Sequence, residues 1–297
     1  MTAGLHPRGV FCAALTPVTA DLAPDHARFA AHCRRLLDEG CDGIALLGTT
    51  GEANSFSTAE RQALLEAAVA AGIAPGRLLP GTGVAALTET VALTRHAVSL
   101  GVTTVVMLPA FYYKGVTEDG LFASYAEVVE RVADPRLRIV LYHIPQMSAV
   151  PITVPLIGRL RARYPGTFAG IKDSAGDLAH MEALVERFPG LAVLAGADPP
   201  MLPLLRQGGA GCITATSNLV AADLAFIFRH AADPARAAEV EAAQARVVAA
   251  RNRASRFAQM ASLKAMLAER LGDDGWRRMR PPLLPLSAEE AAALRQA

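Results

Sequence analysis

From residue 10 to about residue 230, short apolar runs alternate with longer segments in which apolar residues recur every three or four positions. The first pattern is typical of buried strands and the second of amphipathic helices. No linker rich in Pro, Gly or Ser interrupts the alternation. It predicts eight strand–helix pairs, with strands at Val10–Pro17, Gly43–Gly48, Arg77–Gly83, Thr103–Pro109, Arg138–Pro145, Phe168–Asp173, Leu191–Gly196 and Gly211–Thr216. The clearest helical segments are Asp25–Glu39, Thr58–Ala71, Thr88–Leu100, Asp119–Val132 and Leu178–Phe188.

The spacing of these elements predicts an α/β fold of the closed (β/α)₈ type, a TIM barrel. Continuous apolar strands such as 104–108 are buried on both faces, and parallel strands need crossovers of about a dozen residues or more. Eight such units in about 220 residues match the size of this barrel. An open doubly wound sheet is the alternative. We disfavour it because no GxGxxG motif follows the first strand, and Gly81-Thr82-Gly83 lacks the third glycine.

The strand pattern stops after about residue 234. Ala235–Arg253 and Arg256–Leu271 are predicted helices, and a short last helix is expected from about Ser287, after Pro281-Pro282. We therefore predict a barrel over residues 1–233 and a C-terminal helical region over residues 234–297. This region is expected to pack on the barrel or on a neighbouring subunit.

Composition removes several classes of function. The 297 residues are 52% hydrophobic and 19% charged, which excludes a disordered chain. A net charge of +1 without long runs of like charge predicts neither nucleic-acid nor membrane binding. Residues 1–10 contain no export signal, so we expect a cytoplasmic protein, and the uncharged stretch 96–113 is too interrupted to span a membrane. Four cysteines and seven histidines show no metal-binding spacing, so we expect reduced thiols, no metal and no cofactor.

Lys172 is the most informative single residue. Of 29 basic residues only three are lysines, and this one falls inside an apolar strand near its carboxyl end, where the active site of such a barrel lies. Adjacent strand residues point to opposite faces, so Asp173 is not its obvious ion-pair partner. Burial favours the neutral amine, which can attack a ketone and form a Schiff base. A structural ion pair remains the alternative interpretation.

Other candidate residues have simpler structural interpretations. Lys264 lies mid-helix and is expected to extend its amine to the surface. Lys114 is expected in a solvated loop, and contact with an anionic substrate is the alternative. Asp198 is expected to cap the next helix rather than to bind a sugar hydroxyl. The turn Gly48-Thr49-Thr50-Gly51 is either a carboxylate cradle or an ordinary connection, and Tyr142 is either a core aromatic or a proton shuttle.

Together these motifs resemble the dihydrodipicolinate synthase / N-acetylneuraminate lyase family, the pyruvate-dependent class I aldolases. The matching segments are Gly48-Thr-Thr-Gly-Glu52, Tyr142-His-Ile-Pro145, Gly170-Ile-Lys-Asp-Ser174 with Gly176-Asp177, Gly211-Cys-Ile-Thr214 and Arg280-Pro-Pro-Leu-Leu-Pro285. They agree in order and spacing with one fold and cover nearly the whole chain.

The resemblance implies a role for each matching residue. Lys172 would form the imine with pyruvate or a 2-oxo acid. Thr49 and Thr50, with Gly51 beside them, would hold the carboxylate of that substrate. The backbone of Ile213 would line the pocket. Tyr142 would be the general acid/base. Thr49 would link it to a tyrosine of the adjacent subunit, best matched by Tyr113, with Tyr112 one residue away. This arrangement implies a homo-oligomer, a tetramer or dimer of dimers.

The chain departs from the synthase branch at one position. Pro145-Gln146-Met147 places Met147 where synthases usually carry an arginine for the second carboxylate, and His143 replaces a more frequent asparagine. We therefore expect a lyase that cleaves or forms a 4-hydroxy-2-oxo acid, such as a 2-keto-3-deoxy sugar acid, to or from pyruvate and an aldehyde. The alternatives are 4-hydroxy-tetrahydrodipicolinate synthase, a 2-keto-3-deoxy acid dehydratase and, less favoured, a non-catalytic binding homologue.

Overall fold

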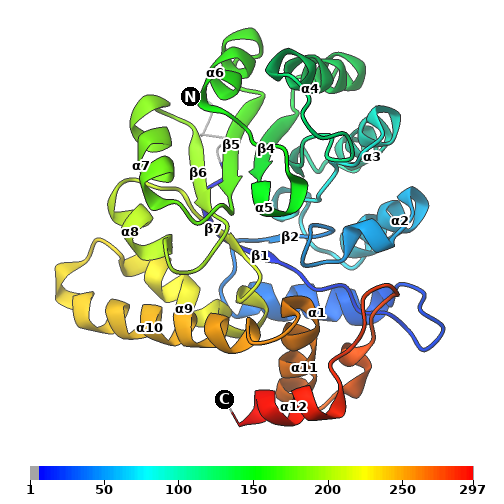
Figure 1. Ribbon diagram of the computed structural model, residues 1–297, viewed down its shortest axis with the longest axis vertical. Coiled ribbons are helices and arrows are strands. Elements are labelled where there is room, and N and C mark those ends of the chain that lie inside the picture. Colours follow the sequence, from blue (N-terminus) through cyan, green and yellow to red (C-terminus); the bar gives the residue numbers. More distant parts are fainter. Residues whose placement is uncertain (1–6, 297) are drawn as a thin grey trace.

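The computed structural model describes residues 7–296, and within them a parallel sheet curls around a central axis (Figure 1). Its strand order is β2-β1-β7-β6-β5-β4-β3. Each recorded strand pairing is parallel, which confirms the predicted class and the barrel. The strands are β1 (Gly9–Ala13), β2 (Gly43–Ala45), β3 (Thr104–Met107), β4 (Arg138–His143), β5 (Phe168–Asp173), β6 (Ala192–Ala195) and β7 (Gly211–Thr214).

The predicted strand Arg77–Gly83 is shorter and less regular than expected. Arg77 belongs to a 3₁₀ turn, η2 (Pro75–Arg77), and the segment after it forms isolated parallel bridges at Leu78 and Gly81. Its backbone bonds β2 through Leu79 N to Ile44 O, 2.8 Å, and β3 through Val106 N to Pro80 O, 2.9 Å. Proline has no N–H to donate, so Pro80 breaks the regular ladder while the segment still closes the barrel.

Helices cover the outside of the strands (Figure 1). The five barrel helices predicted above begin and end within one residue of those observed, and capping side chains mark the start of four of them. In the C-terminal region, the helix predicted from Arg256 begins three residues later, at Gln259. Ser57 forms a capping box with Glu60, and Asp25, Thr117 and Asp177 cap their helices. The barrel helices are α1 (His26–Asp38), α2 (Thr58–Ala70), α3 (Leu87–Ser99), α4 (Glu118–Val132), α5 (Pro145–Ser148), α6 (Val154–Arg163), α7 (Leu178–Arg187), α8 (Met201–Arg206) and α9 (Ser217–His230), with the 3₁₀ turn η1 (Ala53–Ser55).

Strand side chains alternate between two cores. Those facing outward pack against the helices in a large cluster that includes Leu141, Ile171 and Val193. Those facing inward fill the barrel with a smaller cluster that includes Val140, Tyr142, Leu194 and Ile213. Lys172 pairs in register with Tyr142 and Leu194, so its side chain points into the barrel, as the alternation predicts.

The C-terminal region is helical, as predicted. It contains η3 (Pro234–Arg236), α10 (Ala237–Ala254), α11 (Gln259–Leu271), η4 (Asp274–Arg277) and α12 (Ala288–Arg295). Helix α10 packs along α9, and α11 contacts both α9 and α10 (Figure 1). A boundary at residue 233 stays a prediction, since this region packs directly on the barrel.

Among the described residues, no helix combines the length and apolar character needed to cross a membrane. Residues 1–6, which form part of the stretch expected to carry no export signal, lie outside the described residues. All four cysteines are buried free thiols, as the sequence predicts.

Candidate active site

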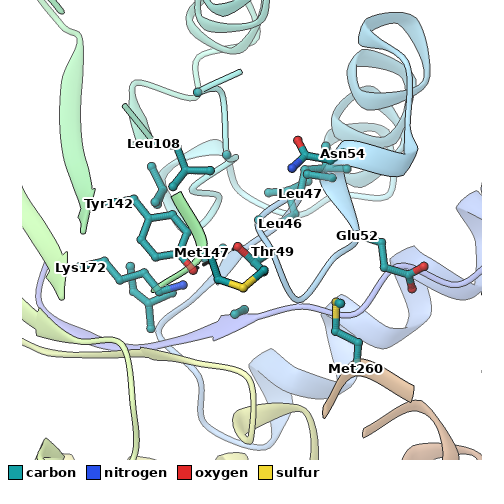
Figure 2. A pocket seen from close by; sticks show the side chains of 18 of the residues that line it. Leu46, Leu47, Thr49, Glu52, Asn54, Leu108, Tyr142, Met147, Lys172 and Met260 are labelled. Carbon is teal, nitrogen blue, oxygen red and sulfur yellow. Dashed lines mark hydrogen bonds between the residues drawn. The ribbon is translucent and has the colours of Figure 1, made fainter. Parts of the chain in front are cut away.

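Lys172 lies on β5 and projects into a cavity at the carboxyl ends of the strands. Its side chain is only 5% exposed. Its side-chain nitrogen, Nζ, lies 4.1 Å from the centre of the Tyr142 ring, on the neighbouring strand β4. Figure 2 shows the amine and the phenol directed toward Thr49 across the cavity. The fold thus places a buried amine beside a buried phenol in a space open to a small molecule.

Tyr142 has its hydroxyl 3.3 Å from Thr49 Oγ1. Burial alone would raise the pKa of Tyr142, but the positive charge of Lys172 and the hydrogen bond with Thr49 outweigh it and lower the pKa below its usual value of 10.0. A phenol with a lowered pKa exchanges a proton more readily near neutral pH. The structure therefore joins Lys172, Tyr142 and Thr49 in one cluster.

The turn after β2 holds Thr49 and Thr50 at the cavity wall. Two backbone hydrogen bonds close it, Glu52 N to Thr49 O and Ala53 N to Gly48 O, both 3.1 Å. Gly51 packs so closely that an added Cβ would lie 2.9 Å from Ala14 O, and its carbonyl accepts from Thr16 Oγ1 at 2.8 Å. Within residues 7–296 no hydrogen bond is recorded from the backbone N–H of Thr50 or Gly51.

Two adjoining cavities of about 320 and 800 Å³ share Lys172, Tyr142, Thr49 and Ile213 in their walls. Ile213 is fully buried on β7. The smaller cavity extends toward Glu52 and Leu108, and the larger extends toward α10 and residues 282–290 of the C-terminal region. Of the predicted site residues, Lys172, Tyr142, Thr49, Thr50 and Ile213 line this space, and Gly51 shapes the turn that holds the threonines.

Tyr113 does not reach this cluster within one chain. It lies in the loop after β3 with its side chain 72% exposed, next to Tyr112, which is 71% exposed. The two rings meet edge to face at 5.3 Å. The predicted contribution of Tyr113 to a site in a neighbouring subunit therefore stays a prediction.

The expectation for Lys264 was wrong. This side chain on α11 is fully buried and forms an ion pair with Glu52, which is also fully buried. Lys264 Nζ also donates to Arg278 O at 2.8 Å. Burial lowers the pKa of Lys264, although Glu52 opposes the shift. A helix that is apolar around most of its circumference, as 261–268 is, becomes buried on all sides, so Lys264 has no path to solvent.

The ion pair also assigns a role to Glu52, which sequence reasoning quoted only as part of a motif. Glu52 directly follows the threonine turn and adopts a left-handed backbone with φ 54°. That conformation disfavours a residue with a side chain, and Lys264 stabilises it by anchoring the carboxylate. The turn is thereby fixed to the C-terminal region.

Two further expectations are corrected. Asp198 does not cap α8, whose N-cap is Pro200. Its carboxylate is fully buried and accepts from Thr216 Oγ1 at 2.7 Å, because the loop after β6 folds toward β7. Lys114 is exposed but not simply solvated, since its amine donates to Phe111 O and, at 2.9 Å, to Ser148 O.

A polar cluster behind β5 was not evident from the sequence, because its members are far apart in the chain. His180 Nδ1 lies 2.7 Å from buried Asp173 Oδ2, and the His143 and His180 rings are 5.5 Å apart. The candidate ligand atoms lie within 4.8 Å of one another. However, His143 Nδ1 accepts the N–H of Ile152 at 3.1 Å, so the neutral ring carries its proton on the other nitrogen. The cluster fits a hydrogen-bonded support of β5 better than a metal site.

The fold and the pocket together define the class of protein, an α/β-barrel enzyme with a buried amine at the carboxyl ends of its strands. Comparison with known proteins narrows the class. Residues 6–297 match the model of the Dihydrodipicolinate synthetase family. An uncharacterized DapA-like lyase of Chloroflexus aurantiacus is 40% identical over 296 residues, covering 98% of this chain and 96% of the relative.

Solved structures agree with this assignment. Dihydrodipicolinate synthase from Agrobacterium tumefaciens superposes with a TM-score of 0.86 at 32% identity, covering 97% of both chains. YagE, a prophage protein of E. coli K12 solved in complex with pyruvate, gives a TM-score of 0.89 at 25% identity, covering 97% of this chain and 96% of its own. The chain belongs to the dihydrodipicolinate synthetase family, and it is a lyase.

Proposed function

We propose that Lys172 forms a Schiff base with the keto carbon of pyruvate or a 2-oxo acid, and that the enzyme cleaves or forms a 4-hydroxy-2-oxo acid. The observation that carries the proposal is the Lys172 amine 4.1 Å from the Tyr142 ring, with Tyr142 bonded to Thr49 at the cavity wall. A binding protein has no need of a buried amine beside a phenol. The unbonded N–H groups of Thr50 and Gly51, with the threonine hydroxyls, would hold the substrate carboxylate.

The proposed cleavage follows from the electron-withdrawing imine. The amine attacks C2 of the 2-oxo acid, and water leaves to give a protonated imine. Tyr142, as the phenolate, then takes the proton of the C4 hydroxyl and becomes a phenol. The C3–C4 bond breaks, and its electron pair moves into the imine to leave an enamine and an aldehyde. The same phenol returns a proton to C3, and water releases pyruvate and regenerates the amine. Condensation is the reverse sequence.

Met147 supports an aldolase over a synthase. Its thioether is 62% exposed and lines the cavity, where an arginine would offer a fork of donors to a second carboxylate. The second candidate is 4-hydroxy-tetrahydrodipicolinate synthase, because several relatives carry that name. One of them, from Listeria innocua, is 33% identical over 212 residues. We also propose that the protein is a cytoplasmic homo-oligomer. In it, Tyr113 of each chain would enter the site of a neighbouring chain.

One assay separates these functions. The enzyme is incubated with a panel of 2-keto-3-deoxy sugar acids, and pyruvate release is followed with a coupled dehydrogenase. We expect pyruvate and an equal amount of aldehyde from the wild type, and neither from Lys172→Ala. Loss of water without pyruvate would identify a dehydratase instead. Efficient condensation of pyruvate with aspartate semialdehyde, together with no cleavage of the panel, would overturn the aldolase assignment.

A further inference from the structure

The polar cluster of His143, Asp173 and His180 lies directly behind the strands that carry Tyr142 and Lys172. His143 ends β4 and Asp173 ends β5, and these two residues pair in register. Adjacent strand residues face opposite sides, so both side chains point away from the barrel interior, where His180 on α7 meets them. None of the three residues lines either cavity. An effect of the cluster on the reaction must therefore pass through other residues.

The carboxylate of Asp173 connects α7 to the loop that follows β5. Its Oδ2 lies 2.7 Å from His180 Nδ1, and its Oδ1 accepts the N–H of Ala175 at 2.9 Å. Because a fully buried carboxylate is costly without hydrogen-bond donors, His180 carries a proton on Nδ1 and donates it to Asp173. The carbonyl of Asp173 accepts the N–H of Gly196 at 2.6 Å. The end of β5 is thus held by α7 through a side chain and by the loop after β6 through the backbone.

The loop that Asp173 holds forms part of the wall of the larger cavity. Ser174 lines this cavity together with Lys172. The backbone N–H of Ser174 donates to His143 O at 2.8 Å, and its carbonyl accepts from Gln146 Nε2 at 2.7 Å. Lys172 directly precedes Asp173 in the chain. A shift of the Asp173 backbone would therefore move both the cavity wall and the residue that carries the amine.

His143 connects the same cluster to a second loop. Its Nδ1 accepts the N–H of Ile152, between α5 and α6, at 3.1 Å. Burial lowers the pKa of His143, although Asp173 opposes the shift, so this ring is neutral near pH 7. The donor recorded for the Asp173 carboxylate from α7 is therefore His180, whose ring lies 5.5 Å from that of His143.

We propose that His180 and Asp173 are positioning residues, and that the hydrogen bond between them holds the end of β5 so that the Lys172 amine meets the substrate in the reactive geometry. The proposal rests on the proposed function, because it assigns the imine to Lys172. A displacement of about 1 Å between reacting groups costs about one-hundredfold in rate, so loss of this hydrogen bond slows the reaction. Binding of the substrate carboxylate depends on the threonine turn after β2 and changes little.

The test measures imine formation with pyruvate as the probe. Each protein is mixed with pyruvate for different times and quenched with borohydride, and the labelled fraction is read from the intact mass. We expect His180→Leu to lower the rate at saturating pyruvate by about tenfold to one-hundredfold, with little change in the half-saturating pyruvate concentration. His180→Asn, whose amide nitrogen can take the place of Nδ1, should recover most of the rate.

A double-mutant cycle tests whether the two residues act as a unit. Asp173→Asn keeps an acceptor for Ala175 but removes the charge that His180 contacts, so it should also slow imine formation. The double variant His180→Leu/Asp173→Asn should be no slower than the slower single variant, since coupled residues are not additive. If His180→Leu does not fold, a wild-type rate in Asp173→Asn refutes the proposal by itself.

His96→Leu is the matched control, because His96 on α3 pairs with Glu66 at 3.3 Å and lines neither cavity. It should form the imine at the wild-type rate. Urea unfolding identifies a merely structural role, in which His180→Leu is less stable but its folded form reacts at the wild-type rate. That result, equal slowing in His180→Leu and His180→Asn, or additive slowing in the double variant would refute the positioning role alone. If the wild type forms no imine, the proposed function fails and this inference with it.

Discussion

Lys264 and Glu52 are each fully buried and form an ion pair with each other. Neither takes part in another ion pair among the described residues. Removing one member of such a pair leaves an uncompensated buried charge, which costs about 3–5 kcal/mol. We predict that Lys264→Met lowers the free energy of unfolding by about that amount, and that the double variant Lys264→Met/Glu52→Gln recovers part of the loss. Urea unfolding followed by fluorescence of Trp276, the one tryptophan, measures both. A Lys264→Met protein as stable as the wild type would contradict the account.

Tyr142 is expected to move protons rather than to hold the imine. Tyr142→Phe should lower kcat for cleavage about one-hundredfold to ten-thousandfold, the usual contribution of general acid–base catalysis. Because the pKa of Tyr142 is lowered from 10.0, phenolate forms at lower pH than usual, and wild-type kcat should rise with pH toward that pKa. The variant should lose this rise while still trapping pyruvate. An unchanged pH profile in Tyr142→Phe would assign the proton transfer to another group.

At this scale the sequence predicted which side chains face inward but not what surrounds them. The alternation along β5 placed Lys172 in the barrel, and the register with Tyr142 confirms that placement. The same reasoning failed for Lys264, since helical periodicity gives the face of a residue and not the depth of the groove that receives it. Asp198 was misjudged for a similar reason. Its partner Thr216 lies on another loop, and local capping rules contain no information about such a contact.

At the scale of elements, Arg280 joins the C-terminal region to the start of α2. It donates to Ser55 O at 2.7 Å, to Leu22 O at 2.7 Å and to the carboxylate of Glu60. The hydrogen bond from Arg280 lowers the pKa of Glu60 from 4.5 to about 2. A carboxyl whose pKa is lowered by folding stabilises the protein above its unfolded pKa, and this stabilisation is lost as the pH falls toward 2.

We predict that Arg280→Gln lowers the free energy of unfolding by about 1 to 2 kcal/mol at pH 7, the contribution of a charged hydrogen bond to a partly exposed group. The difference between wild type and variant should be constant above about pH 5 and shrink as the pH falls from 4.5 to 2. Urea unfolding at several pH values measures it. Glu60→Gln should show the same trend. A difference that grows in acid would contradict the assignment.

Element positions could be predicted closely where apolar runs and caps agree, as at Ser57 and the start of α2. The segment 77–83 was the exception. It is apolar enough for a strand, but Pro80 interrupts the ladder and reduces it to bridges. The contribution of α10 to the wall of the larger cavity could not be predicted either, because α10 follows the last barrel strand and helix in the chain.

At the scale of the whole molecule, we propose that each site is completed by a tyrosine from a second subunit. Tyr112 and Tyr113 are large, exposed side chains on the loop after β3, and neither lines the cavity of its own chain. We predict that Lys172→Ala and Tyr113→Phe are each impaired as homo-oligomers. Mixed after reversible dissociation, they should recover activity, because some sites then combine Lys172 of one chain with Tyr113 of the other.

Tyr112→Phe serves as the control, since the resemblance favours Tyr113 as the residue that crosses the interface. It should be affected less than Tyr113→Phe. Formation of mixed oligomers is checked by native mass spectrometry with chains of different mass. Mixed oligomers that form without any recovery of activity would show that the site is complete within one chain.

The fold class and the location of the amine were accessible from the sequence because both depend on periodicity and strand order. The residues that line the larger cavity could not be predicted in the same way. They come both from strand ends and from residues 251–290, which are distant in the chain.

The central claim is that the amine of Lys172 forms a covalent imine with a 2-oxo acid. Its most direct test is to add pyruvate and then borohydride, and to weigh the intact protein and its peptides. The account predicts a mass increase of one reduced pyruvyl group per chain, located on Lys172 and absent in Lys172→Ala, with Lys114→Ala labelled like the wild type. No mass increase in the wild type, or the same increase in Lys172→Ala, would contradict it.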